Sequence, residues 1–334
     1  MRYEDRRRSV EEAVNKVFLP SGIKIGHADN GHNGVTVILC ENGCVGGVDV
    51  RGGAPGTRET DLLAPEKAAQ SVNAIVLTGG SAFGLESTCG VMRWLAERGK
   101  GFKVSGKTVP IVCGAVIFDL NEKETYYPDI ELGYKACAAA SDKNVAFGAV
   151  GVGKGATVGK LRGMKYACTS GVGAATVKAA GAHVTAVVAV NALGDVFDPE
   201  AGKIVAGCRN RDGSFAFAEK KLLGGEYLDF IFGKGNTTIG CVITDAKLDK
   251  LQTGKLASVA HNGLARTIYP VHTDYDGDTL FALSAGSRPV VNFALLQAAA
   301  VKAVERAVID AVSGSVATEA GFELSDEEKK EVFS

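Results

Sequence analysis

Short runs of β-branched and aliphatic residues alternate along the chain with longer segments of helical periodicity. Several of the short runs are apolar at every position, which is typical of strands that are buried on both faces. Sheets stacked on one another and covered outside by helices would bury such strands. The pattern therefore predicts an α+β protein. Strands are predicted at 35–39, 74–77, 109–117, 183–190, 239–244 and 279–283, and helices at 84–98, 133–140, 247–266 and 291–312.

The ends of the chain and one internal stretch depart from this alternation. Residues 1–8 are highly charged and lead into apolar positions at helical spacing up to Val17, which predicts an amphipathic helix or arm and not a secretion signal. The segment 200–234 is predicted to be exposed and flexible, and 319–334 to form a surface helix or a frayed tail. Because no Pro/Ser-rich linker divides the chain, we expect a single domain over 1–334.

Composition narrows the class of protein. With 334 residues, 46% hydrophobic and 22% charged, the chain can bury a large core. The formal net charge of −1 and the lack of a basic stripe disfavour nucleic acid and anionic membranes as partners. No apolar stretch is long enough to span a bilayer, so cytoplasmic residence is expected. The eight cysteines form no Cys-x-x-Cys pair and the five histidines no cluster, which predicts reduced thiols and no metal site.

The first candidate for chemistry is Asn236-Thr237-Thr238, which stands directly before the predicted strand at 239–244. Turn-forming residues end there, so the Thr237 hydroxyl is expected at the mouth of a sheet. Such a hydroxyl can attack the Asn236 carbonyl in an N-to-O acyl shift, and hydrolysis of the ester would leave Thr237 as a new N-terminus. The freed amine could then act as base for its own hydroxyl.

A second candidate is the acidic run Asp274, Asp276 and Asp278 that follows His272. Carboxylates this close repel and raise one another's pKa, so their clustering requires a compensating interaction. A calcium loop is excluded because its glycine is replaced by Thr279 and its last position carries no carboxylate. Two interpretations stay open: a solvated turn, and a carboxylate pair that balances the charge of a nucleophile's amine or of a lysine.

Together the two segments resemble a family of self-processing hydrolases that includes L-aminopeptidase/D-esterases, β-peptidyl aminopeptidases and the endo-type nylon-oligomer hydrolase. The threonine at the nucleophile position is most similar to the nylon-oligomer branch. The resemblance implies an αββα sandwich of N-terminal-nucleophile type with a distinct topology, and a homotetramer or larger assembly. The matching segments are 22–27, 48–53, 77–86, 116–119, 159–160, 187–191, 235–239 and 272–282.

The resemblance also assigns roles to residues. It makes Thr237 the nucleophile and Asn236 the cleavage-site residue, with maturation into chains 1–236 and 237–334. Asp276 and Asp278 match the acidic pair that supports the nucleophile. The substrate is then a short peptide, a small amide or ester, or a linear aliphatic amide oligomer, and no cofactor is expected.

Further positions match the family outside these two segments. Lys160 matches a lysine near the nucleophile, and Asn191 matches an amide of the oxyanion hole, which is typically worth about 3–4 kcal/mol. Phe118 replaces a tyrosine of several relatives and so lacks a hydroxyl donor at the substrate site. Gly80 and Ser81 are expected to line the same site, with the Ser81 hydroxyl capping a helix that starts near residue 83.

Glycine-rich loops elsewhere in the chain raise the question of nucleotide binding. The glycine loop 153–160 lacks the first glycine and the final Ser/Thr of a phosphate loop, and 151–156 has no acidic ribose ligand after it. Nucleotide binding is therefore disfavoured. Two alternatives remain beside the amidohydrolase: an acyltransferase of the ornithine-acetyltransferase type, and an unprocessed protein that binds a small ligand on the same scaffold.

Overall fold

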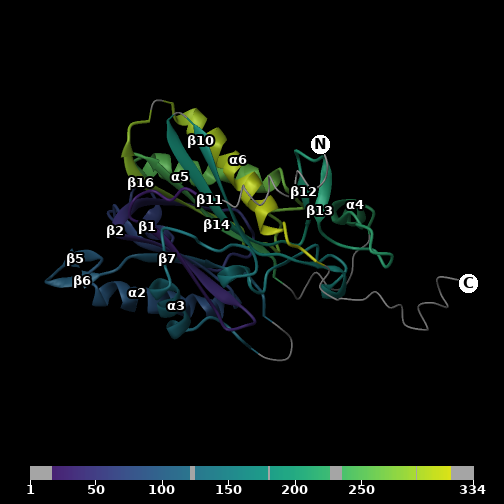
Figure 1. Cartoon of the computed structure of the whole chain (residues 1–334), viewed down its shortest axis with the longest axis horizontal. Helices are drawn as coiled ribbons and strands as arrows, with labels where there is room; N and C mark the ends of the chain where they lie inside the picture. The colour runs from purple at the N-terminus through teal and green to yellow at the C-terminus, as the bar shows by residue number, and fades with distance from the viewer. Residues whose placement is uncertain (1–16, 121–124, 180, 226–234, 291, 317–334) are drawn as a thin grey trace, which may run out of the picture.

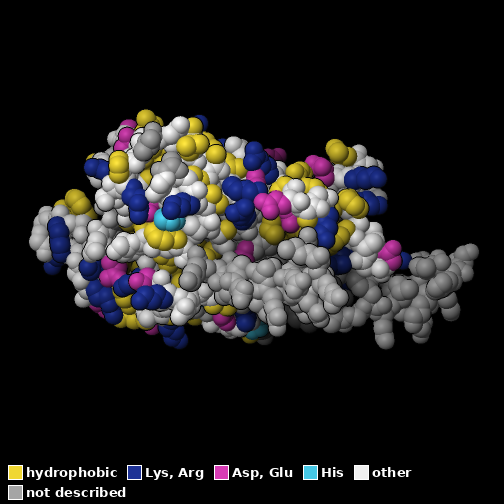
Figure 2. All heavy atoms as spheres, turned by 45° about the horizontal axis from the view of Figure 1, so that its top comes forward, with side chains coloured by type: hydrophobic (Ala, Val, Ile, Leu, Met, Phe, Trp, Pro, Cys, Tyr) yellow, Lys and Arg dark blue, Asp and Glu magenta, His cyan; other side chains and the backbone are white. Residues whose placement is uncertain are grey.

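The computed structural model describes residues 17–120, 125–179, 181–225, 235–290 and 292–316 (Figure 1). The predicted N-terminal helix or arm before Val17 and the predicted helix or tail at 319–334 lie outside these residues. Within the described residues, no helix combines the length and the apolar character needed to cross a bilayer. The face drawn in Figure 2 carries Lys and Arg side chains interspersed with Asp and Glu, in keeping with a net charge of −1.

The long strand β2 (Gly34–Val50) joins two sheets. Its first part pairs with β1 and β4, and after a register irregularity between Leu39 and Cys44 its second part pairs with β16. One sheet holds β1 (Ile23–Asp29), β4 (Val72–Thr78), β7 (Val112–Val116) and β3 (Thr57–Arg58), and the other holds β10 (Val172–Ala179), β11 (Ala182–Asn191), β14 (Thr237–Ala246) and β16 (Thr279–Arg288).

Alternate residues of the strands build three apolar layers. In β11, Val188 packs toward α5 (Lys250–Ala265) and α6 (Phe293–Ala311), whereas Val187 packs toward the other sheet. In β4, Ile75 joins the layer between the sheets, whereas Val76 faces α2 (Ser87–Glu97) and α3 (Ile130–Ala138). Figure 1 shows the two sheets lying between these helix pairs. The predicted αββα sandwich is confirmed.

The remaining elements are short and lie outside the two sheets. They are the hairpin β5 (Phe102–Val104) and β6 (Lys107–Val109), the pair β8 (Thr157–Val158) and β9 (Cys168–Thr169), the small sheet of β12 (Asp195–Asp198), β13 (Lys203–Ala206) and β15 (Ile268–Tyr269), helix α4 (Ala218–Leu223), and 3₁₀ turns at Asp61–Leu63, Ser81–Glu86, Gly151–Gly153 and Met164–Tyr166.

Most predicted elements are present, with corrections at their ends. The strand predicted at 109–117 is divided, because Pro110 has no N–H to donate and separates β6 from β7. Helix α3 begins three residues before the predicted Gly133, since Asp129 caps it by accepting a hydrogen bond from Leu132 N. The segment 200–234, predicted to be exposed and flexible, contains β13 and α4 and is exposed only in part, since Ala206, Cys208 and Ala218 are buried; 226–234 lie outside the described residues.

Candidate active site

Thr237 is the first residue of β14, the strand between β11 and β16 in the second sheet. Its position in the register is opposite Asn191, the last residue of β11. Thr237 is 5% exposed and the preceding Asn236 is 2% exposed, so the bond between them is enclosed. The Thr237 hydroxyl donates a hydrogen bond to the Asn236 carbonyl oxygen. The expected location at the mouth of a buried strand is confirmed.

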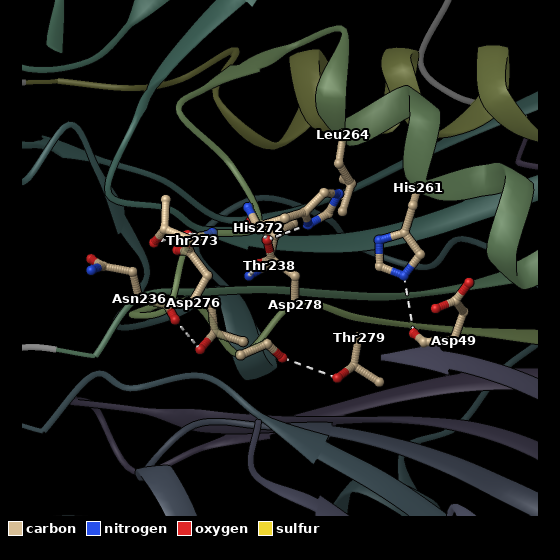
Figure 3. Close-up of polar contacts among 12 residues, drawn as sticks. Asp49, Asn236, Thr238, His261, Leu264, His272, Thr273, Asp276, Asp278 and Thr279 are labelled. Atoms are coloured by element: carbon tan, nitrogen blue, oxygen red, sulfur yellow. Dashed lines mark hydrogen bonds and ion pairs between the residues drawn. The ribbon is translucent and has the colours of Figure 1, made fainter. Parts of the chain in front are cut away.

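The loop before β16 lies directly against this bond, and Figure 3 shows Asn236, Asp276 and Asp278 close together. Asn236 N donates to the Tyr275 carbonyl at 3.2 Å, and Gly277 N donates to the Asn236 carbonyl at 2.9 Å. A Cβ on Gly277 would lie 2.9 Å from the Thr237 hydroxyl oxygen and 2.8 Å from the Ala54 carbonyl oxygen. Only glycine fits there, and its N–H polarises the carbonyl that the Thr237 hydroxyl contacts.

Asp278 connects the loop to the start of β14. Its Oδ1 accepts a 2.6 Å hydrogen bond from Thr238 N, one residue after Thr237. Its Oδ2 accepts from both His272 N, at 3.0 Å, and His272 Nδ1, at 2.8 Å. Both oxygens of this buried carboxylate are therefore engaged, which fixes the loop and the first residues of β14 against each other.

Asp276 is held within its own loop. Its Oδ2 accepts hydrogen bonds from Thr273 N at 2.8 Å and Thr273 Oγ1 at 2.6 Å. Burial, and next the negative charge of Asp278, raise the pKa of Asp276 to about 6, against the opposing effects of Thr273 and of the positive charge of Lys160. A carboxyl group with a pKa in this range can exchange a proton near neutral pH. The expected acidic pair is present, with different surroundings for its two members.

Lys160 and Asn191 form a buried pair beside the threonine. Lys160 Nζ donates to Asn191 Oδ1 at 2.8 Å and to the Asn191 carbonyl at 2.9 Å, and Thr157 N also donates to Asn191 Oδ1, at 3.1 Å. These bonds fix the orientation of the amide, so that its NH₂ group is on the other side and donates to the Phe118 carbonyl at 2.8 Å. An amide NH₂ has two hydrogens, and one of them is used in this bond.

The predicted substrate-site residues follow two parallel neighbours, with Gly80 and Ser81 after β4 and Phe118 after β7. A Cβ on Gly235 would lie 2.9 Å from Phe118 Cβ, so the Phe118 side chain packs against the segment just before Asn236. Ser81 N donates to the Ile117 carbonyl at 3.0 Å, which attaches the Gly80–Ser81 turn to the same edge. The expectation that Ser81 caps a helix is wrong, because a 3₁₀ turn begins at Ser81 itself and the capping position is Gly80, which has no side chain.

Several residues at the site had no role assigned from the sequence. Asp119 Oδ1 accepts a 2.6 Å hydrogen bond from Gly80 N, and burial raises the pKa of this carboxyl to about 6. Gly277 N donates to the Asn236 carbonyl, and His272 is hydrogen-bonded to Asp278. The sequence offers weak signals for two of these residues. Gly277 is a glycine between two acidic residues, and Asp119 follows a predicted buried strand.

The fold is shared with solved enzymes. A β-aminopeptidase from Burkholderia sp. superposes with a TM-score of 0.63 at 23% identity, over 88% of this chain and 84% of that one. An L-aminopeptidase D-Ala-esterase/amidase from Ochrobactrum anthropi, described as a new variant of the N-terminal-nucleophile hydrolase fold, gives 0.64 at 19% identity, over 94% and 92%. The architecture is therefore that of this variant of the hydrolase fold.

The chain belongs to peptidase family S58, whose model matches residues 20–322. It is 44% identical to an uncharacterized aminopeptidase of Mycobacterium leprae, over 82% of this chain and 79% of that protein. It is 33% identical to a 6-aminohexanoate-oligomer endohydrolase of Kocuria sp., over 79% and 73%. The family resemblance found in the sequence is confirmed, and the chain is a hydrolase of the class that acts on peptide and amide bonds.

Proposed function

We propose that the chain cuts its own Asn236–Thr237 bond and then hydrolyses amides with Thr237 as an N-terminal nucleophile. One observation carries the proposal: the Asn236 carbonyl receives both the Thr237 hydroxyl and the Gly277 N–H. The first is the attacking group of an acyl shift, and the second donates to the oxygen on which negative charge develops. Both groups are in place in the uncut chain.

The proposed self-cleavage has two steps, an N-to-O acyl shift and the hydrolysis of the resulting ester. Thr237 Oγ1 bonds to the Asn236 carbonyl carbon, the carbon–nitrogen bond breaks, and the hydroxyl proton ends on the Thr237 nitrogen. Water then adds to the resulting ester, and the carbon–oxygen bond breaks. The products are a carboxylate on Asn236, an amine and a hydroxyl on Thr237, and one proton, which is released to water. We assign Asp276, whose backbone pairs with that of Asn236 and whose pKa is raised to about 6, to accept the hydroxyl proton in its ionised form before the proton reaches the nitrogen.

The same groups support hydrolysis of a substrate once the bond is cut. In the uncut chain the Asn236 carbonyl occupies the place beside Thr237 that a substrate carbonyl needs, and both residues are buried. In the cut enzyme the Thr237 amine serves as base for its hydroxyl. We assign the Asn191 NH₂ to the substrate oxyanion, with Lys160 holding the amide in orientation. Water then releases the acyl group from Thr237.

For the substrate we propose short peptides with a free N-terminus, small amides or esters, or linear aliphatic amide oligomers. The relatives described as aminopeptidases and as 6-aminohexanoate-oligomer endohydrolases support this range. Phe118 brings an apolar ring without a hydroxyl to the segment beside the nucleophile, which suits an aliphatic acyl chain.

The test is an amide-hydrolysis assay on purified wild-type protein, with α- and β-amino acid p-nitroanilides and 6-aminohexanoate oligomers as substrates. Thr237→Ser, which keeps a hydroxyl, is the conservative control for Thr237→Ala, which removes it. We expect activity from the wild type and from Thr237→Ser, and none from Thr237→Ala. Amide hydrolysis by Thr237→Ala at the wild-type rate would rule out the assigned nucleophile.

A further inference from the structure

The carboxylate of Asp278 contacts a half-buried histidine, His272, that the proposed chemistry does not use. Its backbone N and its Nδ1 both approach Asp278 Oδ2, at 3.0 and 2.8 Å. Since a carboxylate oxygen accepts, the hydrogen of this imidazole is on Nδ1. His272 thus holds one oxygen of Asp278 while the other accepts from Thr238 N at 2.6 Å. A continuous hydrogen-bonded path connects the imidazole to the residue after the nucleophile.

A second histidine fixes the orientation of the first. The His261 ring, on α5, packs edge-on against His272, and their ring centroids are 4.9 Å apart. Figure 3 shows the two residues side by side. His261 Nε2 is 3.0 Å from the Asp49 carbonyl oxygen, which can only accept, so the hydrogen of His261 is on Nε2. Burial lowers the pKa of His261 to about 4, and this ring is therefore neutral at neutral pH. His272 therefore packs against an uncharged ring that is itself hydrogen-bonded to the backbone.

Two features of the His272–His261 arrangement destabilise the folded state. His272 has a φ of 58°, in the left-handed region that a residue with a side chain rarely adopts. Its Nε2 and the Nδ1 of His261 are buried and make no hydrogen bond to the part of the chain that is described. Backbone strain and unpaired buried polar atoms persist where the surrounding structure maintains them, and they gather at functional sites.

The same strand offers an internal comparison. At the far end of β14, His183 N and Nδ1 bond to the two oxygens of Asp245 at 2.7 and 3.0 Å. Asp245 also contacts Arg288 at 2.8 Å, and none of these three residues lies near Thr237, which begins the strand. The chain therefore holds two similar His–Asp pairs, one beside the nucleophile and one at the opposite end of its strand.

We infer that His272 is a positioning residue of the active site, which acts through Asp278 to keep Thr237 in line with the carbonyl that it attacks. The inference rests on the proposed function. In this proposal the Nδ1–H of His272 fixes the Asp278 carboxylate. Asp278 Oδ1 then holds Thr238 N, and with it the backbone at the start of β14.

Three substitutions separate this task from a general contribution to folding. His272→Asn places an amide donor where Nδ1–H is, and asparagine tolerates the left-handed region. His272→Gln places its donor farther out, near the position of Nε2. His272→Gly keeps the backbone relaxed and removes the donor. His183→Ala is the matched control, because it removes the similar bond at the other end of β14.

The measurements are the rate of cleavage at 236–237, followed by mass spectrometry, the kcat and KM of the processed enzyme, and the melting temperature of each variant. We expect His272→Gly and His272→Gln to lower the cleavage rate and kcat on the order of tenfold to a hundredfold, with KM changed less than about twofold, as for a lost hydrogen bond to a charged group. We expect His272→Asn and His183→Ala to stay within about threefold of the wild type.

The outcomes separate the inference from the function on which it rests. Equal rates for His272→Asn and His272→Gln would overturn the inference even where His272→Gly does not fold. A fall in melting temperature with wild-type rates in the processed enzyme would also overturn it, because the bond would then be structural only. A wild-type chain that neither cuts itself nor hydrolyses amides overturns the proposed function and the inference together.

Discussion

The amide nitrogen of Gly277 lies 2.9 Å from the carbonyl oxygen of Asn236 and donates a hydrogen bond to it. The loop that carries Asp276 and Asp278 thus supplies, through its backbone, the donor for the carbonyl that precedes Thr237. The Thr237 hydroxyl, at the start of β14, contacts the same carbonyl, and the proposed self-cleavage rests on this arrangement.

A side chain at Gly277 should block self-cleavage. In Gly277→Ala the new Cβ would lie 2.9 Å from Thr237 Oγ1 and 2.8 Å from the Ala54 carbonyl oxygen, so the loop must move and withdraw its N–H. We expect cleavage to slow on the order of a hundredfold, the usual cost of losing one oxyanion donor. Gly254→Ala is the control, since Gly254 has open space around it in α5. Cleavage of Gly277→Ala at the wild-type rate would contradict the role of this N–H.

The rate of self-cleavage should rise with pH through about 6. Burial and the charge of Asp278 raise the pKa of Asp276 to about 6, and the base form is the ionised one. The fragments should be quantified over time at pH 5 to 8. A rate that is independent of pH between 5 and 7 would exclude Asp276 as the base.

Asp276 should also make folding less favourable as pH rises. A carboxyl whose pKa is raised in the folded state binds a proton more tightly folded than unfolded, so stability is lost as pH rises from about 4 through about 6. Asp276→Asn keeps an oxygen for the two bonds from Thr273, which both go to one oxygen. We expect its melting temperature, relative to the wild type, to increase between pH 4.5 and pH 7.5. A constant difference would contradict the raised pKa.

Loss of the Lys160 amine should impair catalysis more than binding. Lys160→Met removes the two hydrogen bonds that fix the Asn191 amide, and we expect kcat to fall about tenfold to a hundredfold with little change in KM. Since the charge of Lys160 lowers the pKa of Asp276, the pH midpoint of self-cleavage should also move upward. Lys154→Met, at a lysine that is 3.9 Å from Asp29, is the control and should behave as the wild type. An unchanged midpoint would argue against the Lys160–Asp276 coupling.

The layer between the two sheets should dominate stability. Phe281, in β16, is fully buried in it, and Phe281→Ala should lower the free energy of unfolding by about 3–5 kcal/mol. Phe102→Ala, at a side chain that is 63% exposed in β5, should have a small effect. Urea unfolding of the Thr237→Ala chain compares the two without interference from self-cleavage. Equal effects would be inconsistent with a core between the sheets.

The sequence predicted the layers well because apolar runs such as 239–244 and 279–283 are buried on both faces. The ends of elements depend on local chemistry that periodicity does not report. Pro110 divides a predicted strand, and Asp129 starts α3 early through its side chain. Both residues are visible in the sequence, and weighing them as breaker and cap would have corrected these boundaries.

Some residues of the candidate site could be predicted from residue types alone, and others could not. The hydroxyl of Thr237 and the pair Asp276 and Asp278 follow from residue types at the start of a strand and in a turn. Lys160 and Asn191 are far from Thr237 in sequence, so only the family resemblance placed them beside it. Residue types do not report which backbone N–H groups donate or which side chains meet across a loop, so Gly277 and His272 had no assigned role.

The most direct test of the central claim is intact-protein mass spectrometry on freshly purified wild-type and Thr237→Ala protein. The account predicts two wild-type fragments, Met1 to Asn236 and Thr237 to Ser334, and a single Thr237→Ala chain. A wild-type chain that stays uncut on long incubation yet hydrolyses amides, or a Thr237→Ala chain cut at the same bond, would contradict it.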